Sequence, residues 1–597
     1  MKTKTCRLVH RAGRMLGVAA AACVLAAAAA RAAALPDADP LLLGDEEERL
    51  LVLAPHPDDE TIGAGGLIQE AVELGIPVRV CFLTMGDNNE LAFLFVRKHP
   101  VVMPGAVRRM GETRMGEARE AARRLGLDPS ADLVFLGYPD FGTLHIWNDH
   151  WRDVTPLRSM LTRATAVPYP EARTPGAAYA GEDLLEDLTE VIREFRPTHV
   201  ALPSAADHNV DHRALYLFAR VALWDLASEG IAPERLAYPV HYSRWPAPRR
   251  LHPELEAAPP PLLAGSDEIG WQVFSLAPWQ VTNKLAAVEA HRSQCLYSSG
   301  YLTSFVRTSE WFGDFDDIVL PGGVGREELE DGDTGACAQD DAFLDDLAAE
   351  DPAWRRIADQ QDAEEAQVGG DDLDFLDRRI SSDGRNLTMV CRFSRPVPAR
   401  TAAELRFYGW RPDVPFGQMP KILVRMVPRK VKAVTDLDRK LDASAVAIPD
   451  GLYGNELGIT VPLALLGNPQ KLLVSASVSR GDMPLDWAAW RAVDFGGAAG
   501  AAEPPPPPSA APARPDPYAS ASAARRPSAP DGPKLVPRVS ARQPVVPALA
   551  PLSVPAPEPP PASPPAGKPK PKPGAASAAT RRAHATAAGS ADEAVVW

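Results

Sequence analysis

The segment from residue 50 to residue 60 constrains the fold of this chain more than any other. It begins with the apolar run 50–54, which is typical of a buried strand in a parallel sheet. Pro55 and Pro57 end this run, and the spacing of apolar residues over 61–74 then predicts a helix. A strand that leads directly into a helix is the unit of an α/β fold, in which ligands bind at the carboxyl ends of the strands.

The loop between this strand and this helix carries a histidine and two adjacent carboxylates, His56, Asp58 and Asp59. Imidazole nitrogens and carboxylate oxygens are common ligands of zinc in proteins, so the loop is a candidate metal site. A simpler explanation is helix capping, because an aspartate at the start of a helix accepts backbone N–H bonds. One cap needs one carboxylate, so capping leaves the other aspartate unexplained.

Apolar runs and amphipathic segments alternate over residues 48–321, which predicts a doubly wound α/β domain with a mostly parallel sheet. The strand expected at 198–202 leads into a second polar loop, which contains His208, Asn209, Asp211 and His212. Because parallel strands end at one edge of a sheet, the two polar loops are expected to meet across one crevice. The other elements expected in this domain are strands at 78–84 and 133–136, and helices at 105–125, 182–195 and 213–223.

The sequence of residues 371–495 predicts a smaller, all-β domain of the sandwich type. Short apolar or alternating runs are separated there by Gly, Pro and Asp, and strands are expected at 387–393, 403–408, 422–426, 457–461 and 471–477. The tryptophans of this domain, Trp410, Trp487 and Trp490, are candidates for carbohydrate binding, because sugars stack on exposed indoles. Packing in a core or at its rim explains these tryptophans at least as well.

Three further regions differ from globular sequence. Residues 1–34 have a basic start and an alanine-rich apolar segment, which predicts a signal peptide and a protein that is secreted, periplasmic or bound to the cell envelope. A single-pass anchor is the alternative, although the apolar run is shorter than a typical span of about 20 residues. The acidic residues 322–370 are expected to be a solvated linker, and the Pro/Ala-rich residues 496–597 a disordered tail.

The composition also limits the partners of the chain. A net charge of -15 argues against nucleic acid, since nucleic-acid binding normally needs a basic face. No transmembrane span is expected once the signal peptide has been removed. The basic residues near the end of the tail suit contact with an anionic surface or polymer, but a solvated tail is the simpler expectation.

The first domain resembles the LmbE/PIG-L family of zinc-dependent N-acetylglucosaminyl deacetylases. The resemblance rests on the His-Pro-Asp-Asp-Glu motif at 56–60 and on the Asp-His pair of the second polar loop. It extends over roughly residues 48–320, through segments at 83–87, 114–126, 135–140, 291–294 and 305–310. The resemblance implies an enzyme with a Rossmann-like sheet, helices on both faces, and one zinc ion at the carboxyl edge of the sheet.

Position in these motifs implies that His56, Asp59 and His212 bind the zinc, and that Asp58 is the general base. Zinc would lower the pKa of a water molecule and polarise the amide oxygen of the substrate. Asp58 would take the proton of the water and pass it to the leaving amine. The products would be acetate and a free amino sugar. Asp211, next to His212, is expected to support the ligands from a second layer.

The chain departs from the family pattern at Asn209, where family members often have a histidine that stabilises the oxyanion. Asn209 itself can donate a hydrogen bond to an oxyanion, and the neighbouring His208 is the other candidate for this role. Both alternatives stay open from the sequence.

Four further residues are candidates for substrate binding. Asp87, Tyr138 and Asp140 end strands at the same edge, where they would contact a sugar hydroxyl or orient a histidine ligand, although each also suits a turn. Arg114 is expected to line the pocket, with a surface ion pair as the alternative. The loop that contains His145, Trp147, His150 and Trp151 is expected to be a pocket wall or lid.

The leading hypothesis is therefore an exported zinc hydrolase that removes acetyl groups from an N-acetylated sugar, glycan or glycolipid. One alternative is a carbohydrate-binding protein that has lost turnover, as the departure at Asn209 would suit. Another is a hydrolase of a related amide or ester.

Overall fold

The computed structural model describes residues 35–44, 47–87, 103–151, 155–266, 268–320, 325–330, 334–336, 373–481 and 483–496. The chain divides into two units, Met1–Glu503 and Pro504–Trp597, and all described residues belong to the first. The predicted signal peptide and the predicted tail from residue 497 onward lie outside the described residues.

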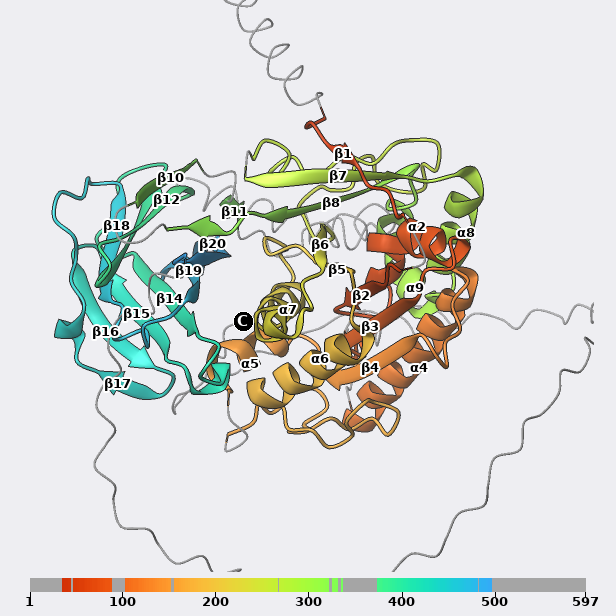
Figure 1. Ribbon diagram of the computed structural model, residues 1–597, viewed down its shortest axis with the longest axis horizontal. Coiled ribbons are helices and arrows are strands. Elements are labelled where there is room, and N and C mark those ends of the chain that lie inside the picture. The colour runs from red at the N-terminus through yellow and green to blue at the C-terminus, as the bar shows by residue number, and fades with distance from the viewer. Residues whose placement is uncertain are drawn as a thin grey trace, which may run out of the picture. The chain divides into compact units, whose positions relative to one another are not determined.

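A five-stranded parallel sheet forms the centre of the first domain (Figure 1). Its strand order is β4-β3-β2-β5-β6, and each pair of neighbours is parallel. The central strand β2 is buried along its whole length, which explains its uninterrupted apolar sequence. Strands β3 and β4 lie on one side of β2, and β5 and β6 lie on the other. The strand order therefore reverses beside β2, and open α/β sheets bind ligands at such a reversal. The strands are β2 (Leu50–Ala54), β3 (Val78–Thr84), β4 (Leu133–Tyr138), β5 (His199–Pro203) and β6 (Glu234–Tyr238).

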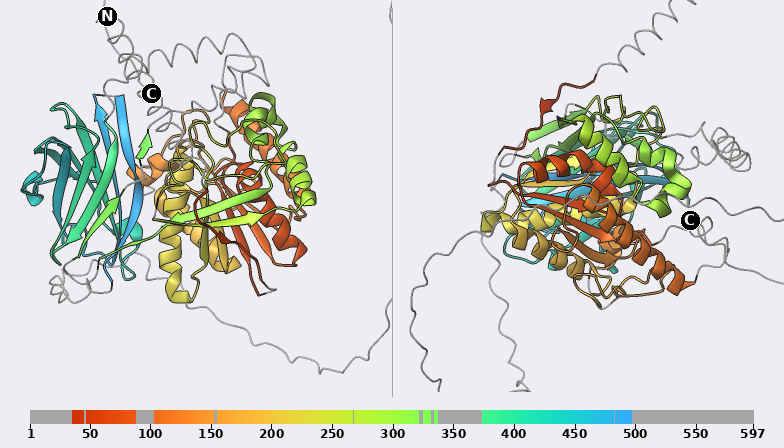
Figure 2. Two further views of the ribbon diagram at one scale, coloured as in Figure 1. Left: turned by 90° about the horizontal axis from the view of Figure 1, so that it is seen from above. Right: turned by 90° about the vertical axis from the view of Figure 1, so that its right-hand side faces the viewer.

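Helices cover both faces of this sheet (Figure 2). One face is covered by α2 (Asp59–Glu73), α4 (Pro104–Arg124), α8 (Pro278–Val288) and α9 (Arg292–Thr303), and the other by α6 (Gly181–Phe195) and α7 (Val210–Leu226). The doubly wound α/β fold predicted from the sequence is confirmed. Among the helices of the described residues, none combines the length and the apolar character that a membrane crossing requires.

Helix α2 is broken at Ala64, which has a non-helical φ of -143°. Beyond the break, the backbone N–H groups of Gly66 and Leu67 donate to the Glu310 carboxylate at 2.7 and 3.0 Å. Lys284 Nζ donates to this carboxylate at 2.7 Å and to the carbonyl oxygen of Ile62 at 2.9 Å. The buried Lys284–Glu310 ion pair therefore satisfies the backbone groups that the break exposes, and it fixes the first turn of α2.

Glu310 belongs to a small second sheet of order β1-β7-β8, which the sequence reading did not predict. Strand β1 pairs in parallel with β7, and β7 pairs antiparallel with β8. The sheet thus joins the start of the described chain to the end of the first domain. Its strands are β1 (Asp39–Pro40), β7 (Ile269–Ser275) and β8 (Ser309–Phe315).

The second domain is a sandwich of two sheets around an apolar core, as the sequence predicts. One sheet has the order β10-β12-β13-β18; the other is eight-stranded, with the order β11-β20-β19-β14-β15-β16-β17 and β9 paired to β20. The strands are β9 (Ile318–Val319), β10 (Gly325–Glu330), β11 (Thr334–Ala336), β12 (Phe375–Ser382), β13 (Asn386–Phe393), β14 (Ala402–Trp410), β15 (Lys421–Val427), β16 (Lys430–Asp436), β17 (Arg439–Leu441), β18 (Glu456–Pro462), β19 (Lys471–Arg480) and β20 (Met483–Asp494).

Part of the predicted acidic linker belongs to this sandwich. Strand β10 pairs with β12, and β11 pairs with β20, so residues 325–330 and 334–336 are strands. Strand β9 already pairs with β20 before the expected domain boundary at residue 321. These strands pair with partners that are far away in the sequence, and such pairing leaves no local periodicity. The sequence therefore did not reveal them. The rest of the predicted linker, at 337–370, lies outside the described residues.

The two domains share an aromatic contact centred on Trp147, which lies in the short helix α5 (Thr143–Asp149). The Trp147 ring centroid lies 5.7 Å from that of Tyr408, 5.6 Å from Phe416 and 6.0 Å from Trp490. Trp147 and its neighbour Trp151 are at most 1% exposed. The expectation that this segment is a pocket wall or lid is therefore wrong: its tryptophans pack between the domains.

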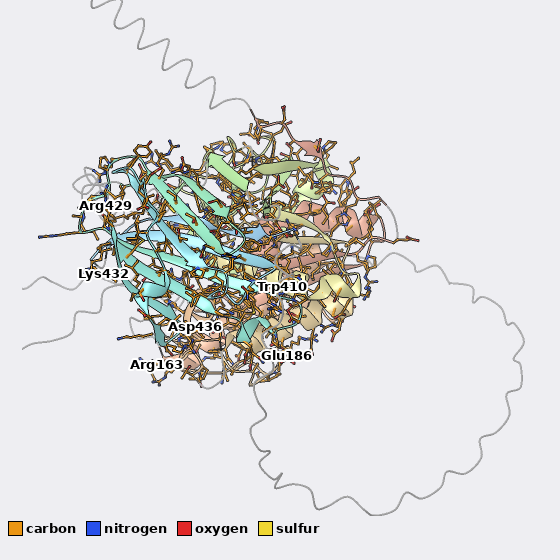
Figure 3. The ribbon with its side chains drawn as sticks, turned by 60° about the vertical axis from the view of Figure 1, so that its left-hand side comes forward. Arg163, Glu186, Trp410, Arg429, Lys432 and Asp436 are labelled. Atoms are coloured by element: carbon orange, nitrogen blue, oxygen red, sulfur yellow. The ribbon has the colours of Figure 1, made fainter. Side chains whose placement is uncertain are left out.

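Packing against the first domain accounts for two of the three tryptophans considered for sugar binding. Trp410 and Trp490 are 5% and 6% exposed. Trp410 lies at the junction of the domains (Figure 3), where its Nε1 donates to Asp225 Oδ1 at 2.7 Å. Core packing is thus the role of these two side chains, and Trp487 is the tryptophan that remains.

The aromatic contact should carry a large share of the stability of the domain pair. We expect Trp147→Ala to lower the free energy of unfolding by about 3–5 kcal/mol, because it opens a cavity in a packed core. Chemical denaturation followed by circular dichroism measures the change. The control is Trp279→Ala on α8, whose side chain is 45% exposed and whose loss should cost no more than about 0.5 kcal/mol. Equal effects of the two substitutions would contradict the packing described here.

Candidate metal and catalytic site

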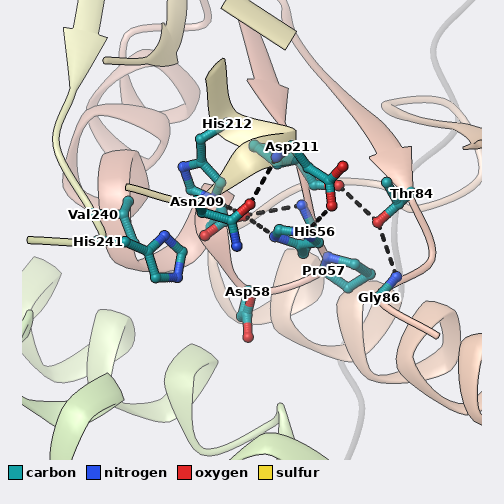
Figure 4. A network of polar contacts seen from close by, with 12 residues as sticks. His56, Pro57, Asp58, Thr84, Gly86, Asn209, Asp211, His212, Val240 and His241 are labelled. Atoms are coloured by element: carbon teal, nitrogen blue, oxygen red, sulfur yellow. Dashed lines mark hydrogen bonds and ion pairs between the residues drawn. The ribbon is translucent and has the colours of Figure 1, made fainter. Parts of the chain in front are cut away.

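The structure brings the three predicted zinc ligands together at the carboxyl edge of the sheet. Figure 4 shows two of them, His56 and His212, close to each other there. His56 follows β2, Asp59 is the first residue of α2, and His212 lies in the first turn of α7. Asp59 Oδ2 lies 3.0 Å from His56 Nδ1 and 3.1 Å from His212 Nε2. All three side chains are buried, and their ligand atoms lie within 4.8 Å of one another. The two polar loops thus meet as the parallel topology requires.

Each histidine is oriented by a carboxylate on its far nitrogen. His56 Nε2 lies 3.2 Å from Asp140 Oδ1 and 3.3 Å from Asp211 Oδ2. His212 Nδ1 lies 3.2 Å from Asp207 Oδ2. Carboxylates in this position fix the tautomer and the ring orientation of histidines that bind metals. The nitrogens that remain, Nδ1 of His56 and Nε2 of His212, both face Asp59 and suit zinc.

The charge of the cluster also fits a cation. Five carboxylates are buried here, and Arg114 brings one permanent positive charge. Burial alone lowers the pKa of His212, but Asp207 and Asp59 raise it to about 9. Burial alone would raise the pKa of Asp59, yet His212 and His56 hold it well below its usual range. Buried carboxylates need a compensating positive charge, which a divalent metal supplies. The five are Asp58, Asp59, Asp140, Asp207 and Asp211.

Asp58, the predicted general base, sits in a strained turn. Its φ of 140° lies in a region that favours glycine. The turn is held by its N–H, which donates to Glu60 Oε2 at 2.9 Å, and by Arg114 Nη2, which donates to Pro57 O at 2.9 Å and to Asp58 Oδ2 at 3.2 Å. Burial raises the pKa of Asp58 to about 6, although Arg114 opposes the shift. Strain that is held by several bonds is typical of a functional position.

Arg114 supports this turn from a buried position. Its guanidinium is buried and also donates to Gly86 O at 2.7 Å. A Cβ at Gly86 would lie 2.0 Å from Arg114 Nη1, and Gly86 has a positive φ of 59°. Glycine is therefore required there for Arg114 to reach the turn. The surface ion pair expected as the alternative is wrong, since Arg114 forms a buried ion pair with Asp58, and a contact of Arg114 with substrate stays a prediction.

The other three residues predicted to bind substrate have different surroundings. Tyr138 is 1% exposed, and its hydroxyl donates to Asp187 Oδ2 on α6 at 2.9 Å. Its side chain therefore points toward α6 and not into the site. Asp140 orients His56, which was the alternative role considered for it. Asp87 is buried and accepts a hydrogen bond from the Tyr169 hydroxyl; burial, together with the charge of Asp140, raises its pKa to about 7.

The two candidates for the oxyanion role have separate positions. Asn209 caps α7, because its Oδ1 accepts the N–H of Asp211 at 2.8 Å. Its side-chain nitrogen then faces the space beside Asp58 (Figure 4). The ring of His208 instead packs against Tyr242, at a centroid distance of 5.5 Å, and against Trp487 at 6.5 Å. The structure therefore favours the amide of Asn209 as the donor.

Sequence reasoning missed Asp207 and His241 as members of the site. Asp207 holds His212 and also accepts the backbone N–H groups of Val240 and His241 at 3.2 and 3.0 Å. The His241 ring lies 4.5 Å from that of His212, between centroids. His241 follows β6, a strand that the sequence reading did not predict. An apolar run at 236–240 that ends in a histidine was the signal available.

Residues 51–223 match the family described as PIG-L: GlcNAc-PI de-N-acetylase. One relative is the 1D-myo-inositol 2-acetamido-2-deoxy-alpha-D-glucopyranoside deacetylase 1 of Saccharopolyspora erythraea, which is 33% identical over 174 residues. This alignment covers 28% of the present chain and 48% of the relative. The chain therefore spans about half the length of that curated relative.

Two solved structures are also similar to this chain. The conserved protein TT1542 from Thermus thermophilus is 23% identical with a TM-score of 0.26, and the match covers 43% of this chain and 84% of that one. The N,N'-diacetylchitobiose deacetylase from Pyrococcus horikoshii is 19% identical with a TM-score of 0.25, and the match covers 41% of this chain and 70% of that one.

The sheet and the cluster at its carboxyl edge define an α/β domain with a site suited to a metal. Residues 51–223 are a domain of the PIG-L/LmbE family, which confirms the resemblance that the motifs indicate.

The orientation of His212 by Asp207 should affect metal binding directly. We expect Asp207→Asn to weaken zinc binding about 10–100-fold, because an amide is a weaker acceptor for the His212 N–H. Competition with a chromophoric chelator measures the affinity. Asp187→Asn is the matched control, since Asp187 bonds to Tyr138 and Thr174 and not to the cluster. An unchanged affinity in Asp207→Asn would exclude the orienting role.

Proposed function

We propose that this protein is a zinc-dependent hydrolase that removes acetyl groups from N-acetylated sugars or glycoconjugates. The observation that carries the proposal is the convergence of His56, Asp59 and His212 beside the strained turn of Asp58. When bound in such a site, zinc acts as a Lewis acid that acidifies water and polarises a carbonyl group. One zinc ion per domain suits the three ligands, which leave a coordination position open.

Residues of the protein itself would carry out the proton transfers and stabilise the developing negative charge. Asp58 takes a proton from the attacking water and returns it to the leaving amine. Glu60 and Arg114 hold Asp58 in its turn through the bonds to its backbone and carboxylate. Asn209 donates its amide N–H to the oxygen on which negative charge develops.

The substrate class follows from the family and from the relative's name. The Saccharopolyspora erythraea relative is a deacetylase of an acetamido-deoxy-glucopyranoside, which supports an N-acetylglucosamine-type amide as the bond that is cut. The composition of residues 1–34 supports export, and hence a secreted, periplasmic or envelope-bound protein that acts on a sugar, glycan or glycolipid.

Two substitutions separate metal binding from catalysis. Asp58→Ala should keep the zinc content of the wild type but lower kcat by about 10²–10⁴-fold, because the proton acceptor is lost. His212→Ala should lose zinc as well as activity. Amine release from N-acetylglucosamine substrates, with and without a chelator, gives the activity, and elemental analysis gives the zinc content. Wild-type turnover in Asp58→Ala would show that another residue is the base.

The departure at Asn209 also favours a second candidate, a sugar-binding protein without turnover. Asn209→Ser tests whether Asn209 serves the oxyanion, because serine keeps the cap on α7 while the amide donor is lost. If Asn209 serves the oxyanion, kcat should fall about 10²–10³-fold with little change in KM or in stability. An unchanged kcat in a working enzyme would exclude Asn209 from this role. A wild-type protein that holds zinc and binds sugar but releases no amine would favour the binding protein.

A further inference from the structure

One side of the site remains accessible from solvent. His56, Asp58 and Asn209 keep between 7% and 9% exposure, whereas Asp59 and His212 are at most 1% exposed. The solvent-facing side is therefore formed by the turn at Asp58 and by the end of the loop that precedes α7. A substrate must approach along this side.

The β domain reaches this same loop through Trp487 on β20. The Trp487 ring lies 4.1 Å from Arg213 Cζ and 6.5 Å from the His208 ring, which it meets nearly edge-on at 80°. His208 directly precedes Asn209, and Arg213 directly follows His212. A residue far away in the sequence thus lies against both ends of the segment that carries a predicted ligand.

Trp487 differs from the other tryptophans considered for sugar binding. Trp410 and Trp490 are buried between the domains, while Trp487 is only half-buried. Tyr242 lies behind His208: it is 3% exposed, its ring lies 5.5 Å from that of His208, and its hydroxyl donates to Ser204 Oγ at 3.0 Å. The indole and the imidazole thus lie together beside the loop, and the phenol packs behind the imidazole.

We propose that Trp487 and His208 form a subsite that stacks a sugar ring next to the N-acetylated sugar at the metal site. The apolar face of a pyranose packs on an aromatic ring such as the indole of Trp487. Arg213 covers one face of the indole, so the sugar stacks on the opposite face. The substrate is then an oligomer or polymer of N-acetylated sugars and not a single sugar.

This inference rests on the proposed function but not on the family domain, because the family match ends at residue 223 and Trp487 lies in the second domain. It gives the β domain a role in the reaction. In the α/β domain alone, the loop at 207–213 would lack the indole that closes this side.

The test compares the full-length protein with Trp487→Ala on N-acetylglucosamine and on its short β-1,4-linked oligomers. We expect the variant to lose about tenfold in kcat/KM on the oligomers, mainly through KM, which equals about 1.4 kcal/mol of lost binding. Activity on the single sugar should stay within about twofold, and Trp487→Phe should recover part of the loss. Trp279→Ala, in an exposed tryptophan of α8, is the matched control and should change neither activity.

A binding measurement provides a readout that is independent of turnover. In the Asp58→Asn background, calorimetry should show weaker binding of the oligomer when Trp487 is replaced by Phe or Ala. An unchanged preference for oligomers in both variants, or an equal loss on the single sugar and the oligomer, would overturn the subsite. A wild-type protein that releases no amine from any of these sugars would instead count against the proposed function, and oligomer binding would still decide the subsite.

Discussion

Asp59 lies between two histidines that come from distant parts of the sequence, and the fold is arranged around this contact. His56 belongs to the same loop as Asp59, after the central strand, whereas His212 follows β5, so the pairing of β2 with β5 is what brings His212 to Asp59. The contact is costly unless a positive charge is shared among the buried groups. A metal ion meets this requirement, and it makes the folding of the sheet edge and the binding of the metal two aspects of one equilibrium.

Supports outside the ligand set hold this geometry. The break in α2 separates its first turn from the rest of the helix, and the Lys284–Glu310 pair closes both ends of the break. Arg114 reaches across from α4 to the turn of Asp58. Residues on α4, α8 and β8 thus decide how the loop after β2 is held. The strain at Asp58 can persist because each of these contacts is buried and bonded.

The local part of this arrangement was predictable from the sequence. The apolar run of β2, the His-Pro-Asp-Asp-Glu loop and the second polar loop led to the α/β fold and to a cluster that the structure does assemble. Asp207 and His241 were not found, because their roles depend on a bond across two strand ends and leave no motif. The roles expected for Tyr138 and Trp147 failed for the same reason. Their partners, Asp187 on α6 and Trp490 on β20, become neighbours only after the chain has folded.

In the second domain, too, the local pattern could be predicted from the sequence and the contacts between distant residues could not. Its strands were visible as alternating runs, but the face that they present to the first domain was not. Of its three candidate tryptophans, the structure buries Trp410 and Trp490 and leaves Trp487 beside the loop of His208. Composition alone could not separate these three, since a buried and a half-buried indole have the same sequence signal.

The proposed function requires one metal ion between His56, Asp59 and His212. Anomalous diffraction at the zinc absorption edge, from crystals of the zinc-loaded protein, locates such an ion. If these residues are the ligands, we expect a single strong peak at about 2.0–2.2 Å from His56 Nδ1, Asp59 Oδ2 and His212 Nε2. A peak in either neighbouring cluster, Asp207–His212–His241 or His56–Asp140–Asp211, would contradict it, as would zinc-loaded crystals without a peak at this edge of the sheet.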